Sequence, residues 1–178
     1  VYTTANVELQ QGILLTHRYS ANVSDPDQRF ILPNANTDTS SLTVQIQTST
    51  TSSNLYTYSV ANDTTTINST ANVYFLEEDT DSRYRVYFGD GTTGRALTSG
   101  NIIILKSLIA DATAPNGART FTPTSTVGGY SNVTVTTVSA ASGGADRDSI
   151  SDIKFNAPRN YQAQNRAVTL NDYIRLVQ

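Results

Sequence analysis

Short runs in which apolar and polar residues alternate recur along the chain, and they constrain the fold more than any other feature of the sequence. A period of two predicts strands with one buried face, because successive side chains of a strand point to opposite sides of a sheet. Gly, Pro, Asn and Ser, which favour turns, separate the runs. We therefore predict a mainly β (α+β) fold, an antiparallel sheet with strands in residues 13–19, 42–46, 54–60, 72–79, 84–88, 102–105 and 133–135 and a short strand within 22–40.

The polar residues of the chain suit strands and turns. Charged residues make up only 15% of the 178 residues, and most polarity comes from Thr, Ser, Asn and Gln. With a formal net charge of −3 the chain has no basic excess to neutralise phosphates, so nucleic acid is not an expected partner. The lack of cysteine excludes disulfides and thiolate zinc sites. No run of about eighteen apolar residues predicts a membrane span.

A short helix is expected from about Ser149 to Ala157. Ser149 and Asp152 form a capping-type pair, and a proline that follows Ala157 is expected to end the helix. Ile150, Ile153 and Ala157 fall on one face of this helix.

A second helix is expected after Thr169, close to the end of the sequence. Four apolar residues recur there at the spacing of an amphipathic helix: Leu170, Tyr173, Ile174 and Val177. A lone helix cannot bury such a stripe, so these four side chains are a candidate subunit interface.

These elements predict two parts. A β-rich domain should span residues 1–142 and carry an inserted strand-rich subdomain at 25–80. Residues 143–178 should form a helical segment that leads into a truncated continuation, since the chain opens without Met and ends inside an expected helix.

The stretch YRVYFGDGTTGRALTSGNIIIL, residues 84–105, contains the pattern G-x-G-x-x-G directly after an expected strand. A dinucleotide site would need a helix after the glycines, whose N-terminus holds the pyrophosphate, whereas a second strand is expected here. A kinase-type loop would need catalytic and metal-binding aspartate motifs that the chain lacks. A Walker loop would need Lys after the last glycine, which is followed by Arg95.

The simpler interpretation is a structural turn. Asp-Gly pairs favour hairpin turns because both residues tolerate a positive φ. We therefore predict that Gly89, Asp90, Gly91, Gly94 and Gly100 turn the chain, with a positive φ at Gly91 in particular, and that the loop binds no nucleotide.

Two other polar features have structural interpretations. His17, the only histidine, falls on the apolar face of an expected strand, and a packed, hydrogen-bonded ring is the simplest role for it. The acidic cluster Glu77, Glu78, Asp79 and Asp81 lacks the ligand spacing of a calcium loop, which favours a solvated hairpin tip.

Three pieces of the sequence, in this order, resemble the baseplate J-like family. They are the stretch at 84–105 quoted above, GGADRDSISDIKFNAP at 143–158 and NRAVTLNDYIRLV at 165–177. The resemblance is strongest to the baseplate wedge subunit of T4-like contractile-tailed bacteriophages. The residues that match the family pattern are Phe88 to Gly91, Gly100-Asn101, Gly143 to Asp146, Ala157-Pro158, Arg166 to Thr169 and Asp172-Tyr173.

The resemblance implies a structural virion protein of the tail baseplate, assembled in the host cytoplasm. It implies no enzymatic activity, cofactor, metal or small-molecule substrate. The implied partners are other copies of the chain, in a homodimer or ring, and other baseplate wedge proteins around the tail tube.

The alternative from another class is a carbohydrate-binding or glycan-cleaving β-domain of a phage tail spike. Such a domain should present clustered exposed aromatic residues and a pair of carboxylates. Tyr56, Tyr58 and Tyr74 could supply the aromatic platform, although the chain contains no Trp.

Overall fold

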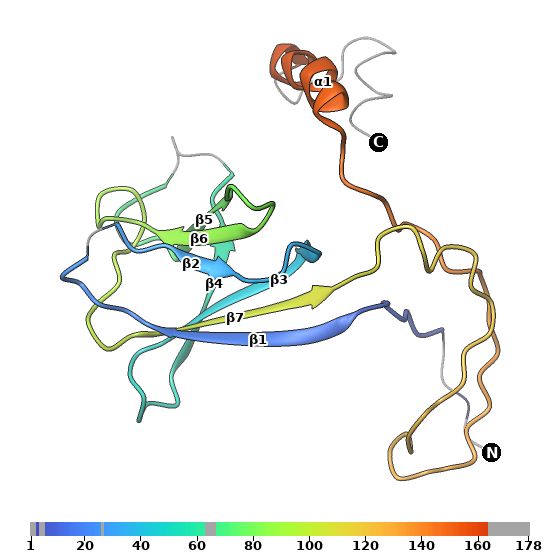
Figure 1. The fold of residues 1–178 in the computed structure, drawn as a ribbon. Helices are drawn as coiled ribbons and strands as arrows, with labels where there is room; N and C mark the ends of the chain where they lie inside the picture. Colours follow the sequence, from blue (N-terminus) through green and yellow to red (C-terminus); the bar gives the residue numbers. More distant parts are fainter. Residues whose placement is uncertain (1–2, 4–5, 26, 63–66, 164–178) are drawn as a thin grey trace. The chain divides into compact units, whose positions relative to one another are not determined.

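The computed structural model describes residues 3, 6–25, 27–62 and 67–163, and Figure 1 shows their fold. The mainly β fold with a short C-terminal helix is confirmed. None of the helices in the described ranges is long and apolar enough to cross a membrane. In chain order the elements are β1 (Ile13–Ser20), β2 (Phe30–Leu32), β3 (Thr37–Gln47), β4 (Leu55–Val60), β5 (Val73–Glu78), β6 (Tyr84–Phe88), β7 (Ile102–Ile109) and α1 (Ile150–Ala163).

The strands form one mixed sheet in the order β1-β7-β3-β4-β5-β6-β2. Every neighbouring pair is antiparallel, as predicted, except β4 and β5, which run parallel. The connection of residues 61–72 is long enough to return the chain to the same end of the sheet, which a parallel pair requires. The sheet curls into a nearly closed barrel. At its open side, the Tyr19 hydroxyl of β1 donates a 2.5 Å hydrogen bond to the Ile31 carbonyl of β2.

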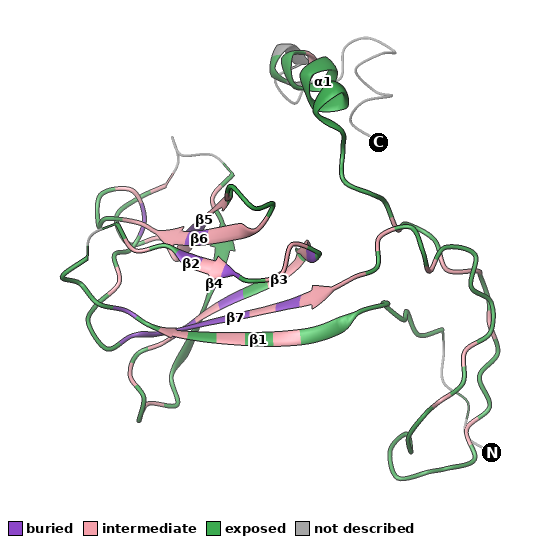
Figure 2. Cartoon of the chain, viewed as in Figure 1, coloured by how far each residue is buried: buried purple, intermediate pink, exposed green. Residues whose placement is uncertain are grey.

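The core lies inside this barrel, where the purple segments of Figure 2 mark buried residues. Leu105 of β7 lies between Val44 of β3 and His17 of β1 in the strand register. The ring of Phe88 packs nearly edge-on against the rings of Phe30 and Tyr58. The buried residues of the cluster are Ala21, Phe30, Leu32, Val44, Ile46, Tyr58, Tyr74, Val86, Ile103 and Leu105.

The inserted subdomain expected at 25–80 is not separate. All the strands in that range belong to the seven-stranded sheet, where β3 pairs with β7 and β2 pairs with β6. A strand needs a partner for its backbone N–H and C=O groups, and these strands find it on strands that lie later in the chain.

The prediction of a strand at residues 133–135 is wrong. Residues 131–149 contain no strand, although Val127 and Tyr130 form an isolated bridge just before them. Val135 is 40% exposed, so the alternating valines build no buried face. The alternation of apolar and polar residues did not suffice to form a strand here, because no described strand pairs with this segment.

The described residues divide into two compact units. The β-rich unit comprises the described residues within Val1–Asp111 and Thr120–Ser139, and the second unit comprises those within Ala112–Arg119 and Ala140–Gln178. The division after Ser139 lies close to the expected boundary at 142, but the excursion of Ala112–Arg119 into the second unit was not foreseen.

Helix α1 begins where the capping pair indicated but continues past the proline. The Ser149 side chain accepts a hydrogen bond from the Asp152 amide at 3.2 Å, and the Ser149 hydroxyl donates to the Asp152 carboxylate at 2.5 Å. Pro158 lies inside the helix, so the expectation that it ends the helix is wrong. A proline removes one backbone donor, and the turns on both sides of it keep the helical path.

Candidate functional site

The glycine loop between β6 and β7 folds back on itself through the Asp90 side chain. The carboxylate of Asp90 accepts hydrogen bonds from the amides of Thr92 and Thr93 at 2.8 and 2.9 Å. These bonds, Thr93 first and Thr92 second, lower the pKa of Asp90 below its ordinary value of 3.8. The Gly91 amide donates to the Gly94 carbonyl at 3.0 Å and closes the turn.

The remaining amides of the loop fix it to the segment that precedes β5. The Gly94 amide donates to the Asn68 carbonyl at 3.1 Å, and the Arg95 amide donates to the Ala71 carbonyl at 2.9 Å. The five successive amides of residues 91–95 therefore all donate to groups of the chain itself. A phosphate-binding loop works by presenting such amides to the ligand. Here the Asp90 carboxylate accepts hydrogen bonds from two of these amides, as a bound anion would.

Two glycines of the loop are required by close packing. A Cβ on Gly89 would lie 2.3 Å from the Thr93 carbonyl oxygen, and one on Gly94 would lie 2.8 Å from Cγ2 of Val73. Gly94 also has a φ of 85°, and Gly91, where there is more space, has a φ of 89°. The positive φ at Gly91 agrees with the prediction.

The turn does not join the strands of a hairpin, so that part of the prediction is wrong. Strands β6 and β7 are not neighbours in the sheet, because β2 and β5 flank β6 while β1 and β3 flank β7. The loop therefore crosses from one part of the barrel to another. Asp-Gly chemistry specifies a tight local turn, and it does not determine which strands then pair.

Gly100 lies in a separate turn at the start of β7. Its φ is 85°, and its amide donates to the Ala21 carbonyl at 3.3 Å. The next residue, Asn101, is buried, and its side chain donates to the Thr48 carbonyl at 3.0 Å and accepts from the Thr98 amide at 2.9 Å. Asn101 thus ties this turn to the end of β3, a role that the Gly-Asn pair in the sequence could have suggested.

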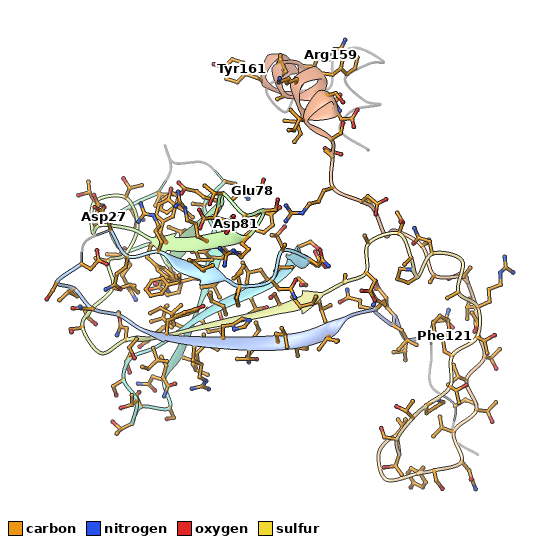
Figure 3. The ribbon with its side chains drawn as sticks, in the orientation of Figure 1. Asp27, Glu78, Asp81, Phe121, Arg159 and Tyr161 are labelled. Atoms are coloured by element: carbon orange, nitrogen blue, oxygen red, sulfur yellow. The ribbon has the colours of Figure 1, made fainter. Side chains whose placement is uncertain are left out.

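The acidic cluster lies at the tip of the β5–β6 hairpin, as predicted, and Figure 3 labels Glu78 and Asp81 there. Arg83 contacts Asp81 at 2.5 Å, and Arg85 contacts Glu77 at 3.0 Å and Asp79 at 3.7 Å. In the ranges that the structure describes, no group of three or more His, Cys, Asp or Glu residues could hold a metal ion.

The aromatic platform considered for glycan binding does not form. Tyr58 and Tyr74 are buried in the barrel core, with 6% and 5% of their surface exposed, whereas Tyr56 is 43% exposed. Burial raises the pKa of both Tyr58 and Tyr74. His17 is half-buried on β1 opposite Leu105, in agreement with a packed position.

Helix α1 carries an apolar stripe that is exposed along its described length (Figure 2). Successive residues of a helix are rotated by about 100°, which places Ile150, Ile153, Ala157 and Tyr161 on one face. Ile150 is 72% exposed and Tyr161, which Figure 3 labels, is 82% exposed. We call these four residues the α1 stripe. The predicted interface residues Leu170, Tyr173, Ile174 and Val177 lie outside the described residues.

The second unit also contains a paired region that the sequence did not indicate. The Asn116 side chain donates to the Gly144 carbonyl at 2.8 Å and accepts from the Gly144 amide at 3.0 Å. The Gly117 amide donates to the Ala141 carbonyl, and the Ala141 amide donates to the Ala118 carbonyl, both at 2.8 Å. We call this pairing of residues 112–119 with residues 140–146 the clasp.

The clasp gives a structural reason for Gly144. A Cβ on Gly144 would lie 2.1 Å from the Ala112 carbonyl oxygen, so no larger residue fits. Asp146 accepts hydrogen bonds from the Thr113 hydroxyl at 3.2 and 3.3 Å.

No protein-family model matches the chain, and no curated protein matches it either.

Proposed function

We propose that the chain is a structural subunit of a bacteriophage contractile-tail baseplate wedge. In this role it assembles by protein–protein contacts into the ring around the tail tube, in the virion, after assembly in the host cytoplasm. The proposed partners are other copies of the chain, in a homodimer or ring, and other baseplate wedge proteins. The proposal includes no enzymatic activity.

The sequence resemblance supports this proposal, and two of its pieces have local structural roles. The FGDG piece forms a turn whose amides are bonded within the chain. The GGAD piece contributes Gly144 and Asp146 to the clasp. Neither arrangement leaves a set of aligned donors for a ligand, which favours roles in folding and assembly.

The observation that carries the proposal is the α1 stripe. Ile150 and Ile153 are 72% and 49% exposed, and Tyr161 lies on the same face at 82%. Full burial of an aliphatic side chain of this size contributes roughly 1.5–3 kcal/mol. An exposed apolar stripe of this kind typically marks a contact with another protein surface.

Sedimentation velocity of the chain, alone and mixed with proteins encoded beside tail sheath and tail tube genes, tests the proposal. We expect self-association or a complex with those proteins. Ile153→Asp should weaken it, because the new charge would be buried in the contact. Asn156→Asp adds the same charge on a different face of α1 and should leave association unchanged. A chain that stays monomeric and binds none of these proteins would contradict the proposal.

A glycan array and a turnover assay test the alternative of a tail-spike domain. The burial of Tyr58 and Tyr74 weighs against an aromatic platform at those positions. Specific glycan binding, whether or not Tyr56→Ala abolishes it, or any glycan cleavage, would favour the tail spike over the wedge subunit.

A further inference from the structure

Asn116 and Gly117 form the only Asn-Gly pair in the sequence, and the structure places that pair in the clasp. Both residues are exposed to solvent. The Asn116 side-chain amide is held by its two hydrogen bonds to Gly144, and the Gly117 amide is held by the Ala141 carbonyl.

An Asn-Gly pair can react without an enzyme. The backbone nitrogen of the glycine loses its proton and attacks Cγ of the asparagine, an N–C bond forms, and ammonia leaves with the side-chain nitrogen. Water then opens the resulting succinimide ring at either carbonyl and gives aspartate or isoaspartate. The overall reaction consumes one water and releases one ammonia, and no oxidant or reductant takes part.

The clasp opposes this reaction in two ways. The attacking nitrogen belongs to Gly117, whose N–H points to the Ala141 carbonyl at 2.8 Å. The electrophilic carbon belongs to the Asn116 amide, whose nitrogen and oxygen are both bonded to Gly144. The reaction therefore requires local opening of the clasp, a motion whose free energy is set by few hydrogen bonds and little buried apolar surface.

We propose that Asn116 is a site of spontaneous deamidation that is protected while the clasp is closed and that holds the clasp open once it has reacted. Aspartate at position 116 loses the donor to the Gly144 carbonyl and turns a carboxylate oxygen toward that carbonyl oxygen. Isoaspartate adds a methylene to the backbone between residues 116 and 117, which displaces the Gly117 amide from Ala141. Once Asn116 has reacted, the pairing of residues 112–119 with residues 140–146 can therefore no longer re-form.

Peptide mapping by mass spectrometry tests this on the intact 178-residue chain, incubated at neutral to mildly alkaline pH. Deamidation adds about 1 Da at the modified residue. We expect Asn116 in the folded chain to react about ten- to a hundredfold more slowly than in a peptide of residues 112–120, because several hydrogen bonds must open first. Equal rates in the folded chain and the peptide would overturn the proposal.

Gly144→Ala tests whether the clasp is the cause of protection. A Cβ there collides with the Ala112 carbonyl, so Asn116 should react at nearly the peptide rate. Asn68, which precedes Ser69 and lies in the β-rich unit, serves as an internal control whose rate should not change. An unchanged rate at Asn116 in this variant would refute the protective role.

Asn116→Asp tests the second half of the proposal without relying on the glycine variant. Hydrogen exchange of the Gly117, Ala141 and Gly144 amides should accelerate about tenfold or more, whereas exchange in β7 should stay the same. Wild-type protection of all three amides in Asn116→Asp would show that deamidation leaves the clasp closed.

Discussion

Replacement of Gly94 by alanine should destabilise the β-rich unit more than replacement of any other glycine with a positive φ in the FGDGTTG turn. Gly94 has a φ of 85°, and a Cβ there would lie 2.8 Å from Cγ2 of Val73. The backbone strain costs about 1–2 kcal/mol, and the added methyl costs about 1–3 kcal/mol through overpacking. Alanine also makes the unfolded chain less flexible than glycine does, which raises the free energy of unfolding by about 0.4–1 kcal/mol. The net loss in the free energy of unfolding is about 1–4.6 kcal/mol.

Gly91→Ala separates the two contributions. Gly91 has nearly the same φ, 89°, but the nearest atom to an added Cβ is Cβ of Ala96 at 3.7 Å. Only the backbone strain remains, so the expected loss in the free energy of unfolding is about 0–1.6 kcal/mol after the unfolded-state effect. Urea unfolding followed by far-UV circular dichroism measures both variants and gives the slope as well as the midpoint.

A double variant identifies the clash. Val73→Ala removes Cγ2, so its combination with Gly94→Ala should cost less than the sum of the two single changes by about 1–3 kcal/mol. Equal losses for Gly91→Ala and Gly94→Ala, or strictly additive losses in the double variant, would refute the claim that close packing on Val73 requires Gly94.

Four further predictions concern the loop, the core and the helix. Titration calorimetry should detect no binding of ATP or NAD, and micromolar binding that Gly91→Val abolishes without unfolding would overturn the structural interpretation of the turn. The pKa of Asp90 is lower in the folded chain than its ordinary value of 3.8, so the unfolded chain binds more protons at acidic pH. The stabilisation from this carboxylate is therefore lost as the pH falls from 3.8 through the folded pKa. In urea unfolding, the difference in the free energy of unfolding between wild type and Asp90→Asn should accordingly shrink below pH 3.8. Leu105→Ala should lower the free energy of unfolding by about 2–5 kcal/mol, because the side chain is fully buried, and a loss below about 1 kcal/mol would place it outside the core. Ser149→Ala should destabilise α1 by about 1 kcal/mol through loss of the cap, seen as faster amide exchange in the first turn, whereas Ser142→Ala should have no such effect.

The sequence predicted the strands whose alternation had a partner to pair with. Leu42, Val44 and Ile46 lie in a strand, and Val44 and Ile46 are buried against β7, as their period of two indicated. Val133 and Val135 have the same spacing without a neighbouring strand, and they form no strand. Local spacing describes which face of a strand is apolar, but it contains no information about the partner.

The same limit applies to the glycine turn and to the clasp. The positive φ at Gly91 follows from residue chemistry alone, whereas the pairing of β6 with β2 and β5 depends on the path of the whole chain. Asn116 and Gly144 are 28 residues apart in sequence, and nothing in either neighbourhood indicates their contact. At Pro158 a local rule predicted too much: proline was expected to end the helix, but the helix continues past it.

The parallel contact between β4 and β5 has a mechanical consequence. It pairs only Ser59 with Val73 and Val60 with Tyr74, while the open side of the barrel is bridged by the hydrogen bond from Tyr19 of β1 to Ile31 of β2. The barrel thus consists of two half-shells, β1-β7-β3-β4 and β5-β6-β2, joined along two narrow seams. Under tension applied across these seams, the half-shells should separate before either one unravels, and the interior aromatic rings would then be the first part of the core to meet water.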